Sequence, residues 1–226
     1  VNAVMRRRLL EALMVEGVTI DDPSSTYVDW GVAVGRDTVL RPQTMLTQGT
    51  VVGARCTVGP GCFLADVTVD DGAAIVSSHL VSCHIGPGCS VGPFAHVRPR
   101  TELAEGARAG SFVEIKASRV GKGSKVPHLS YVGDTTIGDN TNIGAGTITA
   151  NYDGRHKHPT VIGNDVKVGS DTVFVAPVTV GDGAYTGAGS TITKDIPDGA
   201  LGVARARQEV VEGYAARRRP PQGDES

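Results

Sequence analysis

Residues 34–58 read VGRDTVLRPQTMLTQGTVVGARCTV, and this stretch sets the rhythm of the whole chain. An aliphatic residue returns at every sixth position, at Val34, Leu40, Leu46, Val52 and Val58. An α-helix cannot keep such residues on one face, because its side chains repeat about every 3.6 residues. A plain alternating strand would not repeat small residues and glycine at the same interval.

The period of six continues far along the chain, which has 226 residues. Further runs are Ile85, Val91, Val97 and Leu103, then Val120, Val126 and Val132, then Ile162, Val168, Phe174 and Val180. Each hexapeptide is predicted to form one short strand and a turn, so three of them complete a triangular coil. The pattern predicts an all-β fold, a parallel β-helix of hexapeptide repeats. At about 18 residues per coil, residues 34–192 would form about nine coils, stacked to roughly 40 Å.

The composition agrees with a narrow, repetitive core. Aromatic residues make up only 4% of the chain, whereas apolar residues make up 40% and there are 30 glycines. The interior must therefore be filled by aliphatic and small side chains, and many turns need glycine.

Three segments are expected along the chain. Residues 1–17 are predicted to form a linker helix, residues 18–199 the β-helix domain, and residues 200–226 a C-terminal extension. The extension is expected to pack up to residue 214 and to end in a disordered tail from residue 217, which is charged and rich in proline.

One interruption of the repeat stands out. Residues 151–160 read NYDGRHKHPT and contain no aliphatic residue, although regular repeats flank them. They are predicted to form a loop thrown out of the prism, and loops on rigid scaffolds often carry function.

Charge and hydropathy exclude several classes of protein. With 22 basic and 24 acidic residues, the chain lacks the basic excess of general nucleic-acid binding proteins. No run of 18 apolar residues is present, so no membrane span is expected. Arg6 to Arg8 precede an apolar stretch, but Glu11 and Glu16 interrupt it and no cleavage site follows, so a signal peptide is not expected. A cytoplasmic location is predicted.

A smooth prism has no deep pocket, so a site is expected where two prisms lie side by side. A homotrimer is the natural packing of three-sided columns. Lysines and arginines between residues 94 and 172 suit a phosphate, or they simply keep the outer faces soluble. His128 follows the inward Val126 by two residues and is predicted to point outward, where a neutral imidazole near Tyr131 and Glu114 would suit a general base.

Two other patterns raise the possibility of a metal. His79 and His84 are spaced like the zinc histidines of γ-class carbonic anhydrases, but no third histidine stands at a matching distance. Cys56, Cys62 and Cys89 fall on the small inward position and, with Cys83, are interpreted as buried free thiols.

Beyond the repeat, longer motifs resemble a known family. They are Phe-Ala-His-Val-Arg-Pro at 94–99, Phe-Val-Glu-Ile-Lys at 112–116, Gly-Lys-Gly-Ser-Lys at 121–125, His-Leu-Ser-Tyr-Val-Gly-Asp at 128–134, Asn-Ile-Gly-Ala-Gly-Thr-Ile-Thr at 142–149, Asn-Tyr-Asp-Gly at 151–154 and Val-Gly-Ser-Asp-Thr at 168–172. From Ile85 to Arg205 the chain closely resembles the C-terminal acetyltransferase half of the bacterial bifunctional GlmU family.

This resemblance implies a left-handed β-helix and an activity. That family transfers acetyl from acetyl-CoA to glucosamine 1-phosphate, which yields N-acetylglucosamine 1-phosphate for UDP-N-acetylglucosamine and cell-wall synthesis. No metal is needed for this half, and its uridylyltransferase half has no counterpart in this sequence.

The resemblance also implies residue roles. His128 would be the catalytic base, and the N–H of Ala145 would face the thioester oxygen. The sugar phosphate would be bound by Arg98, Lys116 and Lys157, and the sugar would be oriented by Glu114, Tyr131 and Asn142, with Asn151 at its amine. Acetyl-CoA would be bound by Ala145, Asn151, Tyr152, Ser170, Ala188 and Arg205. The alternatives are a hexapeptide acyltransferase with another acceptor, a γ-type carbonic anhydrase, or a non-catalytic scaffold.

Overall fold

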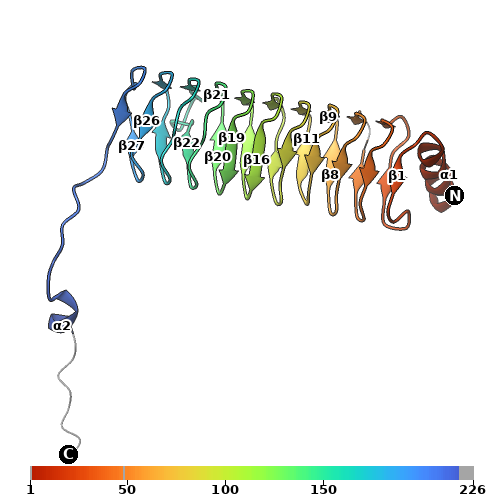
Figure 1. The fold of residues 1–226 in the computed structure, drawn as a ribbon, viewed down its shortest axis with the longest axis horizontal. Coiled ribbons are helices and arrows are strands. Elements are labelled where there is room, and N and C mark those ends of the chain that lie inside the picture. The colour runs from red at the N-terminus through yellow and green to blue at the C-terminus, as the bar shows by residue number, and fades with distance from the viewer. Residues whose placement is uncertain (1, 48, 219–226) are drawn as a thin grey trace, which may run out of the picture.

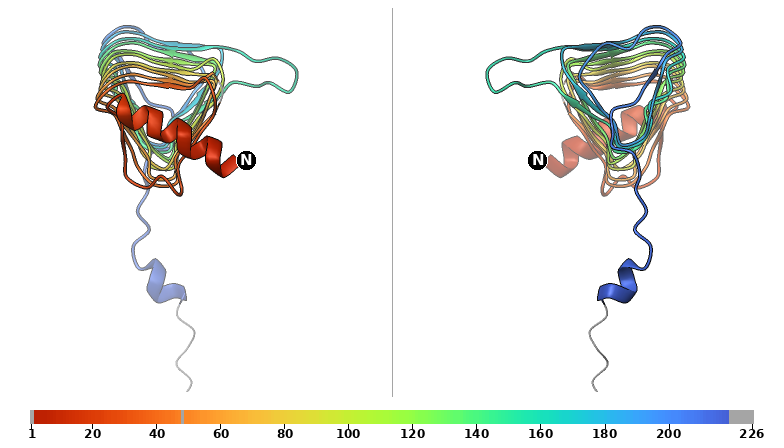
Figure 2. Two further views of the ribbon diagram at one scale, coloured as in Figure 1. Left: turned by 90° about the vertical axis from the view of Figure 1, so that its right-hand side faces the viewer. Right: turned by 90° about the vertical axis from the view of Figure 1, so that its left-hand side faces the viewer.

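The chain coils into a long three-sided prism with a helix at its N-terminal end (Figures 1 and 2). The computed structural model describes residues 2–47 and 49–218. The first face is a parallel sheet of β1 (Thr19–Ile20), β4 (Val39–Leu40), β7 (Thr57–Val58), β10 (Ala74–Ile75), β13 (Ser90–Val91), β16 (Arg108–Ser111) and β19 (Lys125–His128).

The two remaining faces are parallel sheets of the same kind. The second face contains β2 (Tyr27–Val28), β5 (Met45–Leu46), β8 (Phe63–Ala65), β11 (His79–Val81), β14 (His96–Val97), β17 (Glu114–Lys116), β20 (Tyr131–Gly133), β22 (Ile148–Ala150), β24 (Val173–Val175) and β27 (Thr191–Ile192). The third face contains β3 (Ala33–Val34), β6 (Val51–Val52), β9 (Thr68–Val69), β12 (His84–Ile85), β15 (Glu102–Leu103), β18 (Arg119–Val120), β21 (Thr135–Ile137), β23 (Thr160–Ile162) and β25 (Val178–Val180). A short sheet of β26 (Tyr185–Thr186) and β28 (Leu201–Gly202) follows.

The predicted hexapeptide β-helix is confirmed, with small departures in its period. Leu46 pairs with Leu64, 18 positions on, whereas Leu64 pairs with Leu80, 16 positions on. The second face has ten strands rather than the nine coils expected, because the coil begins before residue 34, at Ile20 and Val28.

The core is a column of aliphatic side chains with small polar residues at its corners. The inward residue of almost every short strand is buried, and Phe174 is the one aromatic among the largest fully buried side chains of the described residues. Thr38 shows how a corner is satisfied: its hydroxyl donates to the Gly53 carbonyl (2.8 Å) and accepts from the Cys56 N–H (3.0 Å). Each such bond ties one coil to the next.

Some glycines are required because neighbouring coils approach closely. A Cβ on Gly110 in β16 would overlap the carbonyl oxygen of Pro127 in β19, the strand that ends at His128. Gly106 on the same coil differs, because it has φ +66° and open space around it.

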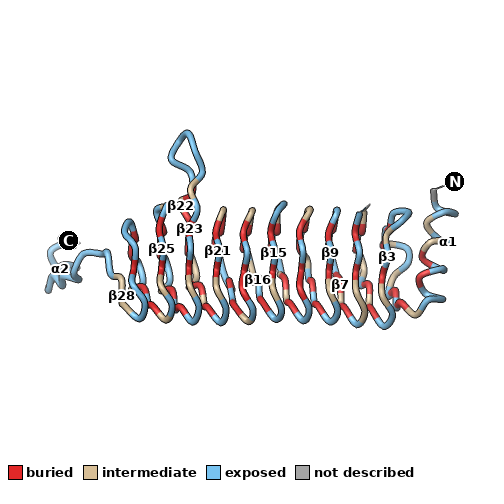
Figure 3. Tube along the Cα trace, turned by 90° about the horizontal axis from the view of Figure 1, so that it is seen from above, coloured by how far each residue is buried: buried red, intermediate tan, exposed pale blue. Residues whose placement is uncertain are grey.

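The ends of the prism are closed differently. Helix α1 (Asn2–Val15) buries Leu10 and Leu13 against the first coil. At the other end, Ala204 still hydrogen-bonds to Ser190 and Thr191 of the last coil, and residues 206–213 then run away from the prism to α2 (Tyr214–Arg218) and are exposed (Figures 1 and 3). The expected packing of residues 200–214 is therefore seen only at the start of the extension, where β28 pairs with β26 and Ala204 bonds to the last coil; residues 206–214 are exposed in the single chain. The predicted disordered tail lies largely outside the described residues, beyond residue 218.

Neither helix in the described part of the chain is long and apolar enough to cross a membrane.

We expect Gly110→Ala to lower the free energy of unfolding by about 1–3 kcal/mol, because the added methyl group meets rigid backbone of the next coil. Gly106→Asn is the control, since asparagine tolerates a positive φ and has room, and it should cost less than about 1 kcal/mol. Denaturant unfolding of both variants measures the difference. Equal losses would contradict the close-approach explanation.

Candidate functional site

The outward column of the second face carries two of the predicted sugar-binding residues. Glu114 and Tyr131 are register partners on β17 and β20. The Arg98 guanidinium donates to the Glu114 carboxylate at 2.7 Å, so this acid neutralises a residue assigned to phosphate binding. A Cβ on Gly133 would lie 2.5 Å from the Tyr131 hydroxyl and 2.7 Å from the Asn151 amide nitrogen. The tyrosine therefore reaches along its strand toward the next corner.

That corner, which we call the Asp134 corner, joins the second and third faces. The Lys116 ammonium lies 3.1 Å from the Asp134 carboxylate, and the Asn151 amide donates to the same group at 2.5 Å. Contact with Lys157, followed by the Asp134 carboxylate, raises the pKa of Lys116, whereas the same contact lowers the pKa of Lys157. Lys116, Asn151 and Lys157 thus lie together at this corner.

The predicted loop at 151–160 is confirmed as a projecting segment, which we call the arm (Figures 2 and 3). Tyr152 and Lys157 form an antiparallel bridge within it. The Asp153 carboxylate accepts bonds from the N–H groups of Arg155 and His156 (both 2.7 Å) and contacts the His158 ring at 2.7 Å. The arm therefore has its own internal order, although its tip is exposed.

A second group of predicted residues lies at the corner between the first and second faces, which we call the His128 corner. His128 is exposed, as predicted, and its imidazole has no hydrogen-bond partner within residues 2–47 and 49–218. The following coils place Ala145, Ser170 and Ala188 at equivalent positions. Asp171 N–H donates to the Ala145 carbonyl (2.7 Å), and Gly189 N–H donates to the Ser170 carbonyl (2.8 Å).

The Ala145 N–H itself donates to no acceptor among the described residues, so it is free to bind an anionic oxygen. Arg205 extends the column, since its Cδ lies 3.9 Å from where a Cβ on Gly189 would stand. Backbone stacking thus aligns four of the residues implied for acetyl-CoA binding, Ala145, Ser170, Ala188 and Arg205, along one edge of the prism. The other two, Asn151 and Tyr152, lie at the Asp134 corner and in the arm.

One chain does not unite all predicted residues. The backbone of Asn142 forms parallel β-bridges with Lys125 and Lys167 and so continues the first face. Tyr131 lies on the second face. Arg98, Lys116 and the arm gather toward the Asp134 corner, across the second face from His128.

Two features were not predicted from the sequence. Asp134 lies in a quoted motif but was given no role. Phe94, Phe112 and Leu129 form an apolar ridge on the His128 corner, with 59%, 59% and 64% of their surface exposed. All three have positive φ (60°, 56° and 50°), and the two phenyl rings stack at 5.1 Å. The signal available in the sequence was the spacing of these three large apolar residues, which lie 18 and then 17 positions apart and so fall on successive coils.

The zinc alternative lacks support in the chain. His79 lies on the second face, stacked on Phe63 at 4.5 Å, whereas His84 lies on the third face, 2.8 Å from Asp70. The two histidines thus stand on different sheets and have different partners. The described residues contain no group of three or more metal-binding side chains.

The cysteines are buried free thiols, as predicted. Burial raises the pKa of Cys83 to about 12 and that of Cys89 to about 11. Such thiols stay protonated near neutral pH and are poor nucleophiles or ligands.

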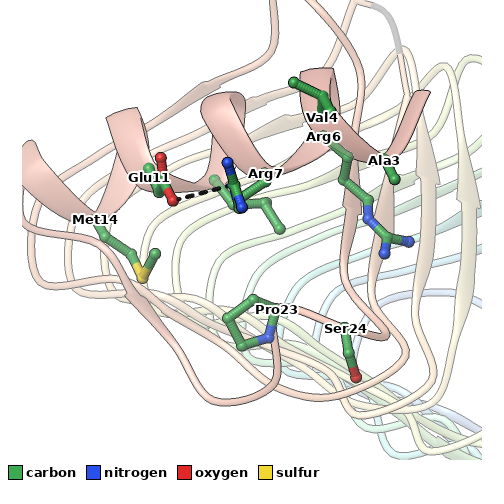
Figure 4. A pocket seen from close by; sticks show the side chains of 9 residues that line it. Ala3, Val4, Arg6, Arg7, Glu11, Met14, Pro23 and Ser24 are labelled. Carbon is green, nitrogen blue, oxygen red and sulfur yellow. Dashed lines mark ion pairs between the residues drawn. The ribbon is translucent and has the colours of Figure 1, made fainter. Parts of the chain in front are cut away.

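A groove of about 510 Å³ lies between α1 and the first coil, remote from these residues (Figure 4). It is lined mostly by apolar groups, with an Arg7–Glu11 ion pair of 3.5 Å on the helix. None of the predicted site residues lines it.

Comparison with known proteins supports the motif reading. Residues 159–194 match the bacterial transferase hexapeptide family (six repeats). The chain is 53% identical to the bifunctional protein GlmU of Mycolicibacterium vanbaalenii over 96% of its own length, and 53% identical to that of Nocardia farcinica over the same share. It spans 44% of the length of these relatives. The solved structure of a UDP-N-acetylglucosamine acyltransferase from Campylobacter jejuni aligns with 90% of this chain and 79% of its own chain. The identity is 16% and the TM-score is 0.44, so this similarity supports no inference about function.

The hydrogen bonds within the arm predict that the Asp153 carboxyl titrates at an unusually low pH. Donation by the His156 N–H, with His158 and the Arg155 N–H, lowers the pKa of Asp153 from 3.8 to about 2. Because the pKa of the Asp153 carboxyl is lower in the ordered arm than in an unfolded chain, the ionised carboxylate stabilises the ordered arm fully above pH 3.8. This stabilisation is lost as the pH falls through about 2. NMR titration of the Asp153 carboxyl carbon should give a midpoint near 2. A midpoint near 3.8 would show that these bonds do not persist in solution.

Proposed function

Because the chain is a hexapeptide-repeat relative of the bifunctional GlmU proteins, we propose that it transfers an acetyl group from acetyl-CoA to the amine of glucosamine 1-phosphate. The observation that carries this proposal is the stacked edge at the His128 corner. It aligns an exposed imidazole, a free backbone N–H and a run of small residues that leave room for an extended cofactor.

The reaction needs a base, because the amine attacks only when it is unprotonated. His128 would take a proton from the ammonium, directly or through water, so that the nitrogen can attack the thioester carbonyl. The Ala145 N–H would stabilise the oxyanion of the tetrahedral adduct. The oxyanion then re-forms the carbonyl as the C–S bond breaks, and the adduct nitrogen loses its second proton to become the amide. The departing thiolate takes up one proton, which protonated His128 would supply, to give coenzyme A, and the other proton is released to solvent.

The basic cluster suits the sugar phosphate. Arg98, Lys116 and Lys157 would bind it, and Glu114, Tyr131 and Asn142 would orient the sugar, with Asn151 at its amine. Acetyl-CoA would lie along Ala145, Ser170 and Ala188 and reach Arg205, with Asn151 and Tyr152 closing over it. No residue requires a metal in this scheme.

We further propose that the working form is a homotrimer with shared sites. The split of the predicted residues between two corners supports this, since an adjacent copy could bring its basic group and arm to the His128 corner. The ridge of Phe94, Phe112 and Leu129 supplies an apolar surface beside His128 for such packing. The cytoplasmic location implied by the family is part of the same proposal.

The substrate is tested by measuring coenzyme A release with glucosamine 1-phosphate, glucosamine 6-phosphate, glucosamine and serine offered separately. We expect the first to be the preferred acceptor by kcat/KM. Preference for serine or an unphosphorylated sugar would place the chain among acyltransferases with other acceptors.

In that assay, we expect His128→Ala to lower kcat by about 10²–10⁴-fold, the usual contribution of a general base. His84→Ala removes another exposed histidine, on the third face, and should keep wild-type turnover. Wild-type turnover in His128→Ala would remove His128 from the reaction.

We expect Phe112→Asp to dissociate the trimer, because a charge replaces apolar surface at the packed edge. Trp30→Ser changes an exposed aromatic residue (81% exposed) near the N-terminal end and should leave the assembly intact. Sedimentation velocity measures both. A wild-type protein that sediments as a monomer would refute the shared-site arrangement.

A further inference from the structure

The basic cluster at the Asp134 corner is organised around one carboxylate. Asp134 accepts from Lys116 Nζ through both oxygens, at 3.1 and 3.3 Å, and from the Asn151 amide at 2.5 Å. The side chains of Lys116 and Asp134 are only 11% and 21% exposed. A pair so shielded from water is screened less than a surface ion pair, and removing one partner leaves the other poorly solvated.

The position of Asp134 is fixed by the backbone on both sides. Its N–H donates to the Lys116 carbonyl (3.0 Å), and its own carbonyl accepts from the Thr160 N–H (3.2 Å), where the chain returns from the arm. Its φ of +50° is tolerated by aspartate and asparagine better than by most residues. Its carboxylate is therefore held at the junction between the second face and the arm.

Charge explains why a carboxylate is needed there. Lys116 and Lys157 interact closely enough to shift each other's pKa, and Arg100 adds further positive charge near Lys157. Repulsion between the two lysines when both are protonated falls on Lys157, whose pKa is lowered by Lys116, and the Asp134 carboxylate opposes this effect. One carboxylate reduces that repulsion and leaves the cluster net positive.

We propose that Asp134 is a positioning residue, whose carboxylate holds the Lys116 ammonium and the Asn151 amide in the arrangement that receives the phosphorylated amino sugar. This inference rests on the proposed function. Asp134 acts through Lys116 and Asn151 and is not assigned a contact with substrate.

The test is Asp134→Asn, which keeps the shape and the tolerance of positive φ but removes the charge. The matched control is Asp66→Asn, at the same corner of an earlier coil with φ +56° and no ion pair among the described residues. We expect Asp134→Asn to raise KM for glucosamine 1-phosphate about tenfold or more, as for loss of a charge-assisted bond. KM for acetyl-CoA should rise by less than about threefold, because Asn151 is the one residue assigned to acetyl-CoA that hydrogen-bonds to Asp134. Asp66→Asn should match the wild type.

A double-mutant cycle separates positioning from general damage. In a Lys116→Ala background, Asp134→Asn should change KM for the sugar phosphate by less than about threefold, because its main target is gone. Full additivity, or equal loss for both substrates, overturns the proposal. Should Asp134→Asn fold poorly, Asp134→Ser replaces it, since serine occupies this corner at Ser82 with φ +43°.

A readout without turnover distinguishes this inference from the proposed function. If the wild-type chain and Asp66→Asn both fail to acetylate any acceptor, the proposed function fails. NMR titration of the Lys116 side chain then decides on Asp134. A lower Lys116 pKa in Asp134→Asn supports its hold on the ammonium, and an unchanged pKa overturns it.

Discussion

The backbone hydrogen bonds between successive coils are the constraint on which the rest of the structure depends. Each coil donates to the coil beside it, so residues some 16 to 18 positions apart become direct neighbours. At the His128 corner this places Ala145, Ser170 and Ala188 in line. The inserted arm lengthens one step, since Thr135 pairs with Thr160, 25 positions on, yet the faces continue in register beyond it. The repeat is therefore a scaffold that holds side chains at fixed intervals along an edge.

A scaffold of this kind makes surfaces rather than pockets. The inward apolar side chains pack against one another and fill the interior, so functional side chains must lie on the outer surface of the prism. Here two adjacent corners carry different functional groups. One has an exposed imidazole and a line of small residues, and the other has a basic cluster, partly balanced by Asp134, and the projecting arm. A site shared between neighbouring copies is the simplest way to bring both to one substrate.

The sequence predicts the features that depend on period alone. The spacing of Val34, Leu40 and Leu46 predicts the prism, the offset from Val126 predicts an outward His128, and the missing aliphatics predict the arm. Features that depend on side-chain reach were not predictable. The pairing of Lys116 with Asp134 joins two coils around a corner, and the face on which Asn142 lies follows from small departures in the period. The exposure of residues 206–213 was also missed, because the repeat ends before them and their sequence carries no period that places them on or off the prism.

The central claim is that the stacked edge at the His128 corner is where a thioester meets an amine. It is tested most directly by a crystal structure of the protein with coenzyme A and glucosamine 1-phosphate. The account predicts that the pantetheine arm runs along Ala145, Ser170 and Ala188, with its sulfur and the sugar nitrogen beside His128. Coenzyme A bound at another face, or at the groove beneath α1, would contradict it.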